Sequence, residues 1–262
     1  MSAEVSIDGR GVATVTVDRP DVHNAFDDRL IAELSKTLSR INENSDVRIV
    51  VLTGAGKTFS AGADMNWMRS MAGYSRDENI ADALRLGEML ERLNSLSKPT
   101  IARVNGHAFG GGVGLIACCD IVVAAAHAKF ALTEVRLGVL PAVISPYVIA
   151  AIGARQARRY FLTAHRMDAA TAERMGLVHR TVDADGLDAA VEEEIEALLA
   201  AGPEALAACK TLIAAVDDPD GTRNEILQPR TAEMIADRRA SAEGQEGLSA
   251  FLEKRKPAWL EP

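Results

Sequence analysis

Hydrophobic positions near the start of the chain follow first the period of a strand and then that of a helix. Residues 12–17 alternate apolar and hydroxyl-bearing side chains, which predicts a strand with one buried face. A helix is predicted to open at Asp27 or Asp28, where an acid suits the positive end of the helix dipole. Its apolar positions recur at helical spacing: Leu30, Ile31, Leu34, Leu38 and Ile41. The unbroken apolar run from Val47 to Thr53 predicts a strand covered on both faces.

Strand and helix signals recur in this order further along the chain. A second helix is predicted from Ile80, Ala83, Leu84, Leu90 and Leu93, and Lys98-Pro99 ends it. Further strands are predicted at Thr100 to Val104, Asp120 to Ala125 and Lys129 to Leu132. Strand, small-residue turn and helix have then followed one another twice. This favours an α/β fold with mostly parallel strands, in which both turns lie at the same edge of the sheet.

Helix signals dominate beyond Pro141. Alanine-rich helical segments follow Ser145, Arg155, Asp168 and Gly186, and only Leu177 to Val182 has a strand pattern. Gly202-Pro203 is the best boundary, because proline suits the first turn of a helix. We therefore predict a core domain at residues 1–200 and a helical segment at residues 201–262. Helices in that segment are expected up to Ala215, from Glu225 to Ala240 and from Gly247 to Lys254.

Five glycines crowd the stretch from Val104 to Val123: Gly106, Gly110, Gly111, Gly112 and Gly114. Since side chains are missing there, backbone N–H groups at the start of an apolar helical run, Leu115 to Cys118, are exposed and can stabilise negative charge. Close packing of a helix against a strand also requires glycine. The stretch alone does not distinguish these two interpretations.

A second small-residue turn runs from Phe59 to Trp67, Phe-Ser-Ala-Gly-Ala-Asp-Met-Asn-Trp. The preceding Gly54-Ala-Gly-Lys-Thr58 looks like the end of a phosphate-binding loop. That pattern needs a glycine where Val51 stands and a helix directly after Thr58, and the sequence supplies neither. An ordinary loop is the alternative to a functional turn here.

Composition and charge exclude several classes of protein. The 262 residues are 48% hydrophobic, which is ample for a folded core. A net charge of −8 argues against nucleic-acid binding, because neutralising phosphates requires a basic field. No stretch is long enough to span a bilayer, and the N-terminus lacks a cationic start and an apolar leader. We therefore expect a cytoplasmic protein without nucleic-acid or membrane partners.

The cysteines and histidines carry no recognisable chemistry in this sequence. Cys118, Cys119 and Cys209 lack the spacing of a disulfide framework or a metal site, so no metal is expected. The two adjacent cysteines lie in an apolar run and are expected to pack in the core. His107 and His127 are likewise interpreted as structural.

Four motifs, taken together and in this order, resemble those of the enoyl-CoA hydratase/isomerase (crotonase) superfamily. They are Phe59-Ser-Ala-Gly-Ala-Asp64, Asn105-Gly-His-Ala-Phe-Gly-Gly-Gly112 with Cys119-Asp-Ile121, Phe130-Ala-Leu-Thr-Glu-Val-Arg-Leu-Gly138 ending in Pro141, and Thr171-Ala-Glu-Arg-Met-Gly-Leu-Val178. The resemblance covers nearly the whole chain. It implies the ClpP/crotonase fold, a spiral of ββα units followed by a C-terminal helical segment that builds trimers, often paired into hexamers.

The resemblance also implies a substrate and the groups that bind it. The substrate would be an acyl-CoA thioester, with no separate cofactor, and its carbonyl oxygen would lie between the N–H groups of Ala63 and Gly111. Two preorganised amides suit the enolate-like oxyanion that the superfamily forms. The CoA contacts would come from Ala61, Asp64, Met65 and Asn66 and, often from a neighbouring subunit, from Phe251 and Lys254. A solvated helix end is the alternative for these last two residues.

The catalytic acid implied by the resemblance is Glu134. Hydratases of this family commonly carry a second glutamate in the glycine-rich helix, and here that position is Gly114. A single carboxyl serves hydration if addition is syn and concerted, and it also serves a Δ3,Δ2-enoyl-CoA isomerase, which moves one proton between two carbons. Two further alternatives stay open: a salt bridge of Glu134 with Arg136 or another neighbour, and a CoA-binding protein without catalysis.

A second departure from the family pattern lies at Pro141-Ala-Val-Ile-Ser-Pro146. The bulky Val143 and Ile144 are expected to shape the acyl pocket. With Gly-Gly-Val-Gly-Leu115, this segment resembles bacterial hydratases of 3-methylglutaconyl-CoA and related branched, carboxylated thioesters, which implies leucine or acyclic-terpene breakdown. Such a substrate requires a cation for its second carboxylate, and the sequence offers three: Arg69, Arg85 and Arg136.

Overall fold

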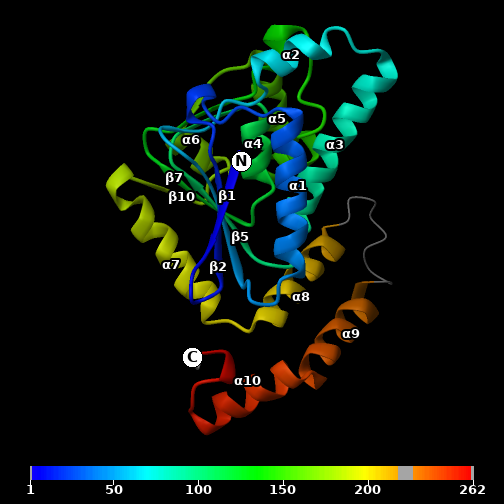
Figure 1. The fold of residues 1–262 in the computed structure, drawn as a ribbon. Helices are drawn as coiled ribbons and strands as arrows, with labels where there is room; N and C mark the ends of the chain where they lie inside the picture. Colours follow the sequence, from blue (N-terminus) through cyan, green and yellow to red (C-terminus); the bar gives the residue numbers. More distant parts are fainter. Residues whose placement is uncertain (1, 218–226, 261–262) are drawn as a thin grey trace.

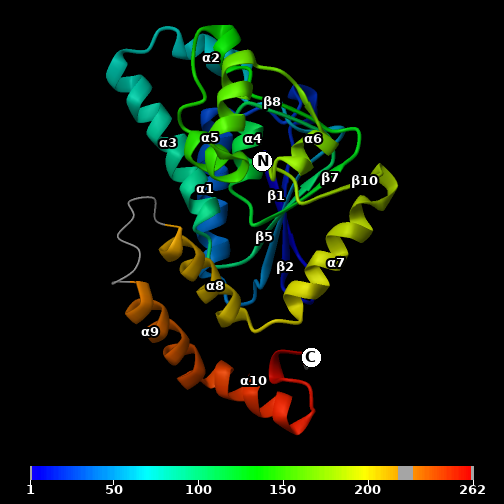
Figure 2. The same ribbon diagram turned by 180° about the vertical axis from the view of Figure 1, so that it is seen from behind.

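The computed structural model describes residues 2–217 and 227–260 and contains two sheets flanked by helices (Figures 1 and 2). The larger sheet has the strand order β1 (Ala3–Ile7), β2 (Val12–Val17), β3 (Ile49–Gly54), β5 (Thr100–Val104), β7 (Ile121–Ala125) and β10 (Arg180–Val182). The smaller sheet has the order β4 (Thr58–Ser60), β6 (His107–Phe109), β8 (Lys129–Ala131) and β9 (Met167–Asp168). Only the β1–β2 and β8–β9 pairs are antiparallel among the strands of these two sheets. The prediction of mostly parallel strands is confirmed.

Ten α-helices and four short 3-10 helices connect the strands in the described ranges. The α-helices are α1 (Asp28–Glu43), α2 (Met65–Met71), α3 (Arg76–Asn94), α4 (Gly111–Ala117), α5 (Ser145–Thr163), α6 (Ala169–Arg174), α7 (Leu187–Leu199), α8 (Pro203–Val216), α9 (Leu227–Ala240) and α10 (Ala242–Glu253). The 3-10 helices are η1 (Pro20–Val22), η2 (Glu134–Leu137), η3 (Ala184–Gly186) and η4 (Ala258–Leu260). In chain order, a long strand, a short strand and one or two helices follow each other repeatedly, which is a series of ββα units.

The larger sheet is covered on both faces, as the apolar run in β3 predicts. Val50 and Leu52 face the main core, which also contains the apolar stripe of α1. Ile49 and Val51 face the opposite way, into a smaller core built with α7. Figure 1 shows α1 and α3 on one side of the sheet and α7 on the other. Successive side chains of a strand point to opposite faces, so a strand buried on both sides reads as continuously apolar.

The structure corrects several predicted elements. The strand β1 was not predicted. Its residues Val5, Ser6 and Ile7 are all exposed, so they do not alternate between a buried and an exposed face. The strands β4 and β6 lie inside the stretches interpreted as turns, because strands of three residues are too short to show a period. The helix α4 begins at Gly111, before the apolar run that predicted it.

Smaller differences concern the second half of the chain. The two-residue strand β9 was not predicted. The helix α10 begins at Ala242, earlier than the predicted Gly247, because Ser241 accepts from the amide of Gly244 and caps it. Glu225, the predicted start of the preceding helix, lies outside the described residues. No single helix in the described ranges is long and apolar enough to cross a membrane. Residues 184–199 and 203–216 together have the length and composition of a membrane span, but the two helices are bent by 100°.

Candidate active site

Three segments of the candidate site follow three neighbouring parallel strands. Residues 61–63 follow β4, Gly110 and Gly111 follow β6, and Glu134 comes shortly after β8. The strands β4 and β6 pair in parallel, and so do β6 and β8. Because the carboxyl ends of parallel strands meet at the same edge of a sheet, the fold brings these three segments together. The expectation that the two small-residue turns share an edge is confirmed.

The first turn is fixed by an isolated parallel bridge between Ala63 and Phe26. The Phe26 amide donates to Gly62 O at 2.6 Å, and the Asp64 amide donates to Phe26 O at 2.7 Å. Ala63 lies between Gly62 and Asp64, the two residues that bond to Phe26, so its own N–H points away from Phe26. Within residues 2–217 and 227–260, the Ala63 N–H has no hydrogen-bond acceptor. It is therefore available to a ligand.

The second turn presents an amide at the start of α4. The Gly110 amide donates to Ala131 O at 2.9 Å, which ties the turn to β8. Gly110 has φ +50°, a conformation that favours glycine. Gly111 is the first residue of α4, so its N–H has no acceptor within the helix, and no acceptor elsewhere in the described part of the chain binds it. This amide is the second available donor.

The two turns touch each other and share a support. A Cβ added at Gly62 would lie 2.8 Å from Phe109 O, so the first turn approaches the second more closely than a side chain would allow. The ring of Phe26 lies beneath the second turn, with Cε2 2.7 Å from the position of a Cβ at Gly111. Phe26 is 1% exposed. One residue thus bonds to the first turn through its backbone and contacts the second through its ring.

Glu134 is half-buried, and one of its carboxyl oxygens is buried without a hydrogen-bond partner in the described structure. It opens η2, and its Oε2 is buried and accepts no hydrogen bond from any described residue. Its Oε1 lies 3.2 Å from the position of a Cβ at Gly110, so the carboxyl faces the glycine turn. Burial raises the pKa of Glu134, and its own backbone amide opposes the shift. A carboxyl that has no ion pair and one desolvated oxygen is suited to proton transfer.

The structure contradicts the alternative that Glu134 forms a salt bridge with Arg136. The guanidinium of Arg136 donates to Ala164 O at 3.0 Å and turns away from the glutamate. No ion pair of Glu134 occurs among the described residues. The carboxyl therefore has no structural partner that would explain it.

Gly114 lies in α4 one turn beyond Gly110, where the family's other glutamate was expected. A Cβ at this position would lie 2.9 Å from Ile144 Cβ, which is closer than such atoms approach. An aliphatic side chain therefore fills the space of the missing acid. Glu134 is the carboxyl that the described structure offers to the two turns.

The residues expected to contact CoA differ in how free their side chains are. The Asp64 carboxylate caps α2 by accepting from the Asn66 amide at 2.8 Å, and it pairs with Arg19 at 3.2 Å. Asn66 Oδ1 accepts from Arg69 at 3.0 Å. Met65 is 69% exposed beside the first turn. The assignment of these residues to CoA, together with that of Ala61, stays a prediction, but Asp64 also has a structural role.

Phe251 and Lys254 are not brought to the two turns within one chain. They lie at the end of α10, which Figure 1 shows at the opposite end of the molecule from α2 and α4. Phe251 is 80% exposed, and Lys254 has φ +57° just past the last helical turn. Contact of this pair with a nucleotide bound at another subunit stays a prediction.

The cysteines and histidines considered in the sequence analysis are not part of the candidate active site. Cys118 and Cys119 are buried, and burial is the main cause that raises the pKa of each thiol. His107 Nδ1 accepts from the Lys129 amide at 3.2 Å, and desolvation lowers the pKa of this histidine. His127 packs near it with ring centroids 6.4 Å apart.

Sequence reasoning missed the segment that supports both turns. Asn24 is fully buried and donates to Ala55 O at 2.9 Å, and its Oδ1 accepts from the Arg19 amide at 2.9 Å. Asn24 has φ +56°, which asparagine tolerates better than most residues. An asparagine four residues after Pro20 was the available signal for a tight turn. No periodic pattern in the sequence could have indicated that Phe26 supports both turns.

Residues 8–262 match the sequence family described as enoyl-CoA hydratase/isomerase. The crystal structure of an enoyl-CoA hydratase from Shewanella pealeana is similar, with a TM-score of 0.95 and 46% identity over 99% of this chain and 96% of that one. Pseudomonas aeruginosa AtuE has a TM-score of 0.94 and 36% identity, with both chains fully covered. The crotonyl-CoA hydratase of Syntrophomonas wolfei is 32% identical over 95% of this chain and 94% of its own. The chain has the predicted crotonase fold and belongs to the enoyl-CoA hydratase/isomerase family.

Proposed function

We propose that this protein hydrates 2-enoyl-CoA thioesters, with Glu134 as its acid and base. The observation that carries the proposal is the carboxyl of Glu134, which has a buried, unbonded Oε2 and lies beside two turns with free amides. Enoyl-CoA and crotonyl-CoA hydratases among its relatives support the same reaction class. The thioester carbonyl oxygen would accept from the N–H groups of Ala63 and Gly111.

In the proposed reaction, water adds to the double bond across carbons 2 and 3. One oxygen of the Glu134 carboxylate takes a proton from water while the hydroxyl forms a bond to carbon 3. The electron pair of the double bond moves toward the thioester oxygen, where two preorganised amides stabilise the negative charge. Carbon 2 then receives the proton, so the carboxylate is regenerated and the atoms of water are all in the product. One carboxyl serves both proton transfers if they occur on the same face.

Isomerisation of 3-enoyl-CoA to 2-enoyl-CoA is the second candidate function. It is favoured by one specific observation, the replacement of the second acid by the packed pair Gly114 and Ile144. An isomerase requires the same two amides and one carboxyl that carries a proton from carbon 2 to carbon 4. The two reactions differ in whether water adds, and so they differ in product.

A branched, carboxylated thioester such as 3-methylglutaconyl-CoA is the finer proposal for the substrate. The sequence segment around Val143 and Ile144 supports it. Its second carboxylate would require a free cation, and all three candidate arginines have partners: Arg69 donates to Asn66, Arg85 pairs with Asp82, and Arg136 donates to Ala164 O. Support for this substrate is therefore limited to the sequence pattern.

The test is an activity panel followed by the absorbance of the conjugated thioester. Purified protein is mixed with crotonyl-CoA, 3-methylglutaconyl-CoA and a 3-enoyl-CoA. Loss of absorbance with a 2-enoyl-CoA is expected for hydration, and the hydroxyacyl product is identified by mass. A gain with 3-enoyl-CoA, without loss with any 2-enoyl-CoA, would establish the isomerase instead. Tight binding of acyl-CoA without any turnover would indicate a non-catalytic CoA-binding protein.

A further inference from the structure

The guanidinium group of Arg19 joins two segments that are distant in sequence. Its Nη1 donates to Ala25 O at 2.6 Å, and its Nη2 lies 2.9 Å from Asp27 Oδ2. The same Nη2 lies 3.2 Å from Asp64 Oδ2. Ala25 and Asp27 are the two neighbours of Phe26 in the chain. Arg19 therefore holds the chain on both sides of Phe26 and ties it to the segment of Asp64.

Two planar peptide groups connect this guanidinium to the first proposed oxyanion donor. Ala25 O and the N–H of Phe26 belong to one peptide group, and this N–H donates to Gly62 O at 2.6 Å. Gly62 O and the N–H of Ala63 belong to the second peptide group. In a trans peptide the N–H points opposite to the C=O, so a fixed Gly62 O fixes the direction of the Ala63 N–H. The hydrogen bonds thus lead from Arg19 to the amide of Ala63.

A cation at the start of such a series also strengthens the last donor. A charged donor makes a stronger hydrogen bond than a neutral one, and each bond in a series polarises the next. Arg19 should therefore make the Ala63 N–H a better donor to an oxygen that gains negative charge during the reaction. Orientation and polarisation of this amide have the same origin.

Two carboxylates keep the guanidinium in place. Asp27 and Asp64 each use Oδ2 for Arg19 and Oδ1 to cap a helix. Asp27 Oδ1 accepts from Leu30 N at 2.8 Å in α1, and Asp64 Oδ1 accepts from Asn66 N at 2.8 Å in α2. The side chain of Asp64 is only 7% exposed, so salt screens this ion pair weakly. The planar fork of arginine suits such a set of acceptors, whereas lysine offers a single point charge.

We propose that Arg19 is a positioning residue of the oxyanion site, which orients and polarises the Ala63 amide through two peptide groups. This inference rests on the proposed function, in which the thioester oxygen accepts from Ala63. It adds a charged side chain to the machinery of that site, although Arg19 acts only through the backbone.

The first test compares the kinetics of Arg19→Lys and Arg19→Gln with those of the unmodified protein. Lysine keeps the charge but loses the fork, and glutamine loses both. With crotonyl-CoA we expect kcat to fall by about tenfold for lysine and by about 100-fold for glutamine, because a misplaced donor weakens binding of the transition state. KM should change by less than about threefold, since the lost interaction is made mainly in the transition state.

The second test needs no turnover. Butyryl-CoA has no double bond to hydrate, and a carbon-13 label at its thioester carbonyl reports how strongly the site polarises that bond. The infrared carbonyl stretch should lie at a lower wavenumber in the unmodified protein than in free butyryl-CoA, and Arg19→Gln should reduce this shift. Calorimetry establishes that the ligand is bound in both proteins.

Asp27→Asn tests the same support without leaving two carboxylates unpaired, which could prevent Arg19→Gln from folding. Asparagine keeps an oxygen that caps α1 but weakens the hold on Arg19. We expect kcat to fall by about threefold to tenfold, with a smaller carbonyl shift. Removal of a negative charge near the oxyanion would by itself raise kcat. An unchanged or raised kcat in this variant would overturn the inference.

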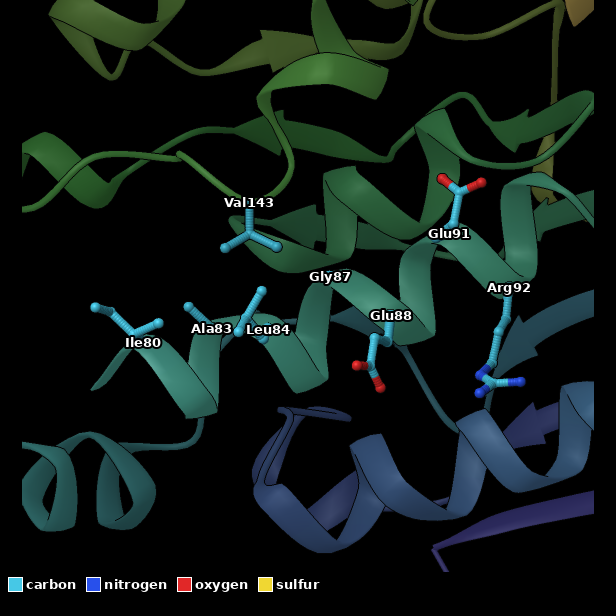
Figure 3. A pocket seen from close by; sticks show the side chains of 8 residues that line it. All are labelled: Ile80, Ala83, Leu84, Gly87, Glu88, Glu91, Arg92 and Val143. Carbon is cyan, nitrogen blue, oxygen red and sulfur yellow. The ribbon is translucent and has the colours of Figure 1, made fainter. Parts of the chain in front are cut away.

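Arg92→Gln is the matched control. Figure 3 shows Arg92 projecting from α3 toward α1, at one end of a groove along α3. Its guanidinium donates to Ser39 Oγ at 2.9 Å, about three helical turns beyond Asp27. The variant therefore loses an arginine contact with the same helix, but at its other end. We expect kcat and the carbonyl shift to stay unchanged, and losses as large as those of Arg19→Gln would overturn the inference.

The outcomes separate this inference from the proposed function. If no enoyl-CoA reacts but the carbonyl shift of bound butyryl-CoA depends on Arg19, the hydratase proposal fails and the inference stands. If crotonyl-CoA is hydrated and Arg19→Gln keeps both the kcat and the shift of the unmodified protein, only the inference fails. A raised KM with unchanged kcat and shift would assign Arg19 to CoA binding and also overturn it.

Discussion

Ile144 occupies the space that a side chain at position 114 would need. Its Cβ lies 2.9 Å from the position of a Cβ at Gly114, so α4 and the segment before α5 approach each other only because residue 114 is glycine. The missing acid and the bulky isoleucine are therefore one structural feature. The proposed active site has an aliphatic wall where a hydratase with two glutamates has a carboxyl.

Gly114→Ala should destabilise the fold by about 1–3 kcal/mol, because the added methyl group overpacks the contact with Ile144. The double variant with Ile144→Ala should recover part of this loss, so the two effects should not add. Urea unfolding of the unmodified protein, the two single variants and the double variant measures the loss and the recovery. Gly73→Ala, whose Cβ would have only an ordinary contact, is the control. Strict additivity would contradict the close contact.

Glu134→Gln should reduce turnover of any enoyl-CoA by about 10²- to 10⁴-fold, because it removes general acid–base catalysis and keeps the shape of the side chain. Steady-state kinetics with crotonyl-CoA measure the loss, and calorimetry should find acyl-CoA binding retained. Glu173→Gln changes an exposed carboxyl on α6 and serves as the control. A fully active Glu134→Gln enzyme would remove this residue from the mechanism.

The raised pKa of Glu134 predicts how stability depends on pH. Burial disfavours the carboxylate, so the folded protein binds this proton more tightly than the unfolded chain does. The stability contributed by the protonated form is complete below the pKa of the unfolded chain, about 4.3, and is lost as the pH rises through the pKa of the folded protein. Glu134→Gln should therefore raise Tm at neutral pH, and the difference should shrink on acidification. A lower Tm for the variant at neutral pH would argue for a hidden partner of the carboxylate.

Replacement of Gly111 tests the second amide donor. Gly111→Pro and Gly111→Ala place the same Cβ against the ring of Phe26, but only proline lacks the N–H. Proline is tolerated at the first residue of a helix, so α4 should persist. We expect kcat of the proline variant to be about 10²- to 10³-fold below that of the alanine variant. Equal rates in the two variants would show that this amide does not bind the oxyanion.

Substitutions at Asp64 separate its role as a helix cap from the predicted contact with CoA. Asp64→Asn keeps an oxygen that caps α2, whereas Asp64→Ala removes it and should cost about 0.5–2 kcal/mol. Thermal unfolding orders the two variants. The KM for crotonyl-CoA shows whether the negative charge matters for substrate, since it should be the same for aspartate and asparagine if the carboxylate serves only α2 and Arg19.

The larger elements of the fold were predictable because burial imposes a period on the sequence. The stripe of α1 and the continuous apolar run of β3 both record which faces are covered. The strands β4 and β6 could not be predicted in this way, because each has only three residues and so shows no period. Their short parallel pairing nevertheless decides where the two turns lie.

The chemistry of the site was predictable as far as it depends on residue types at fixed spacing. Glu134 and the two glycine-containing turns could be named from motifs, but the lack of a partner for the carboxyl could be seen only in three dimensions. The capping role of Asp64 and the filling of position 114 by Ile144 depend on contacts between segments distant in sequence. Such contacts leave no local pattern.

Phe26, a residue of the buried core, supports both turns of the proposed oxyanion site. Its backbone fixes the turn that bears Ala63, and its ring lies against the turn that bears Gly111. The spacing of the two amides is thus set by a residue of the buried core. Exposed side chains elsewhere in the chain can therefore change without moving either amide.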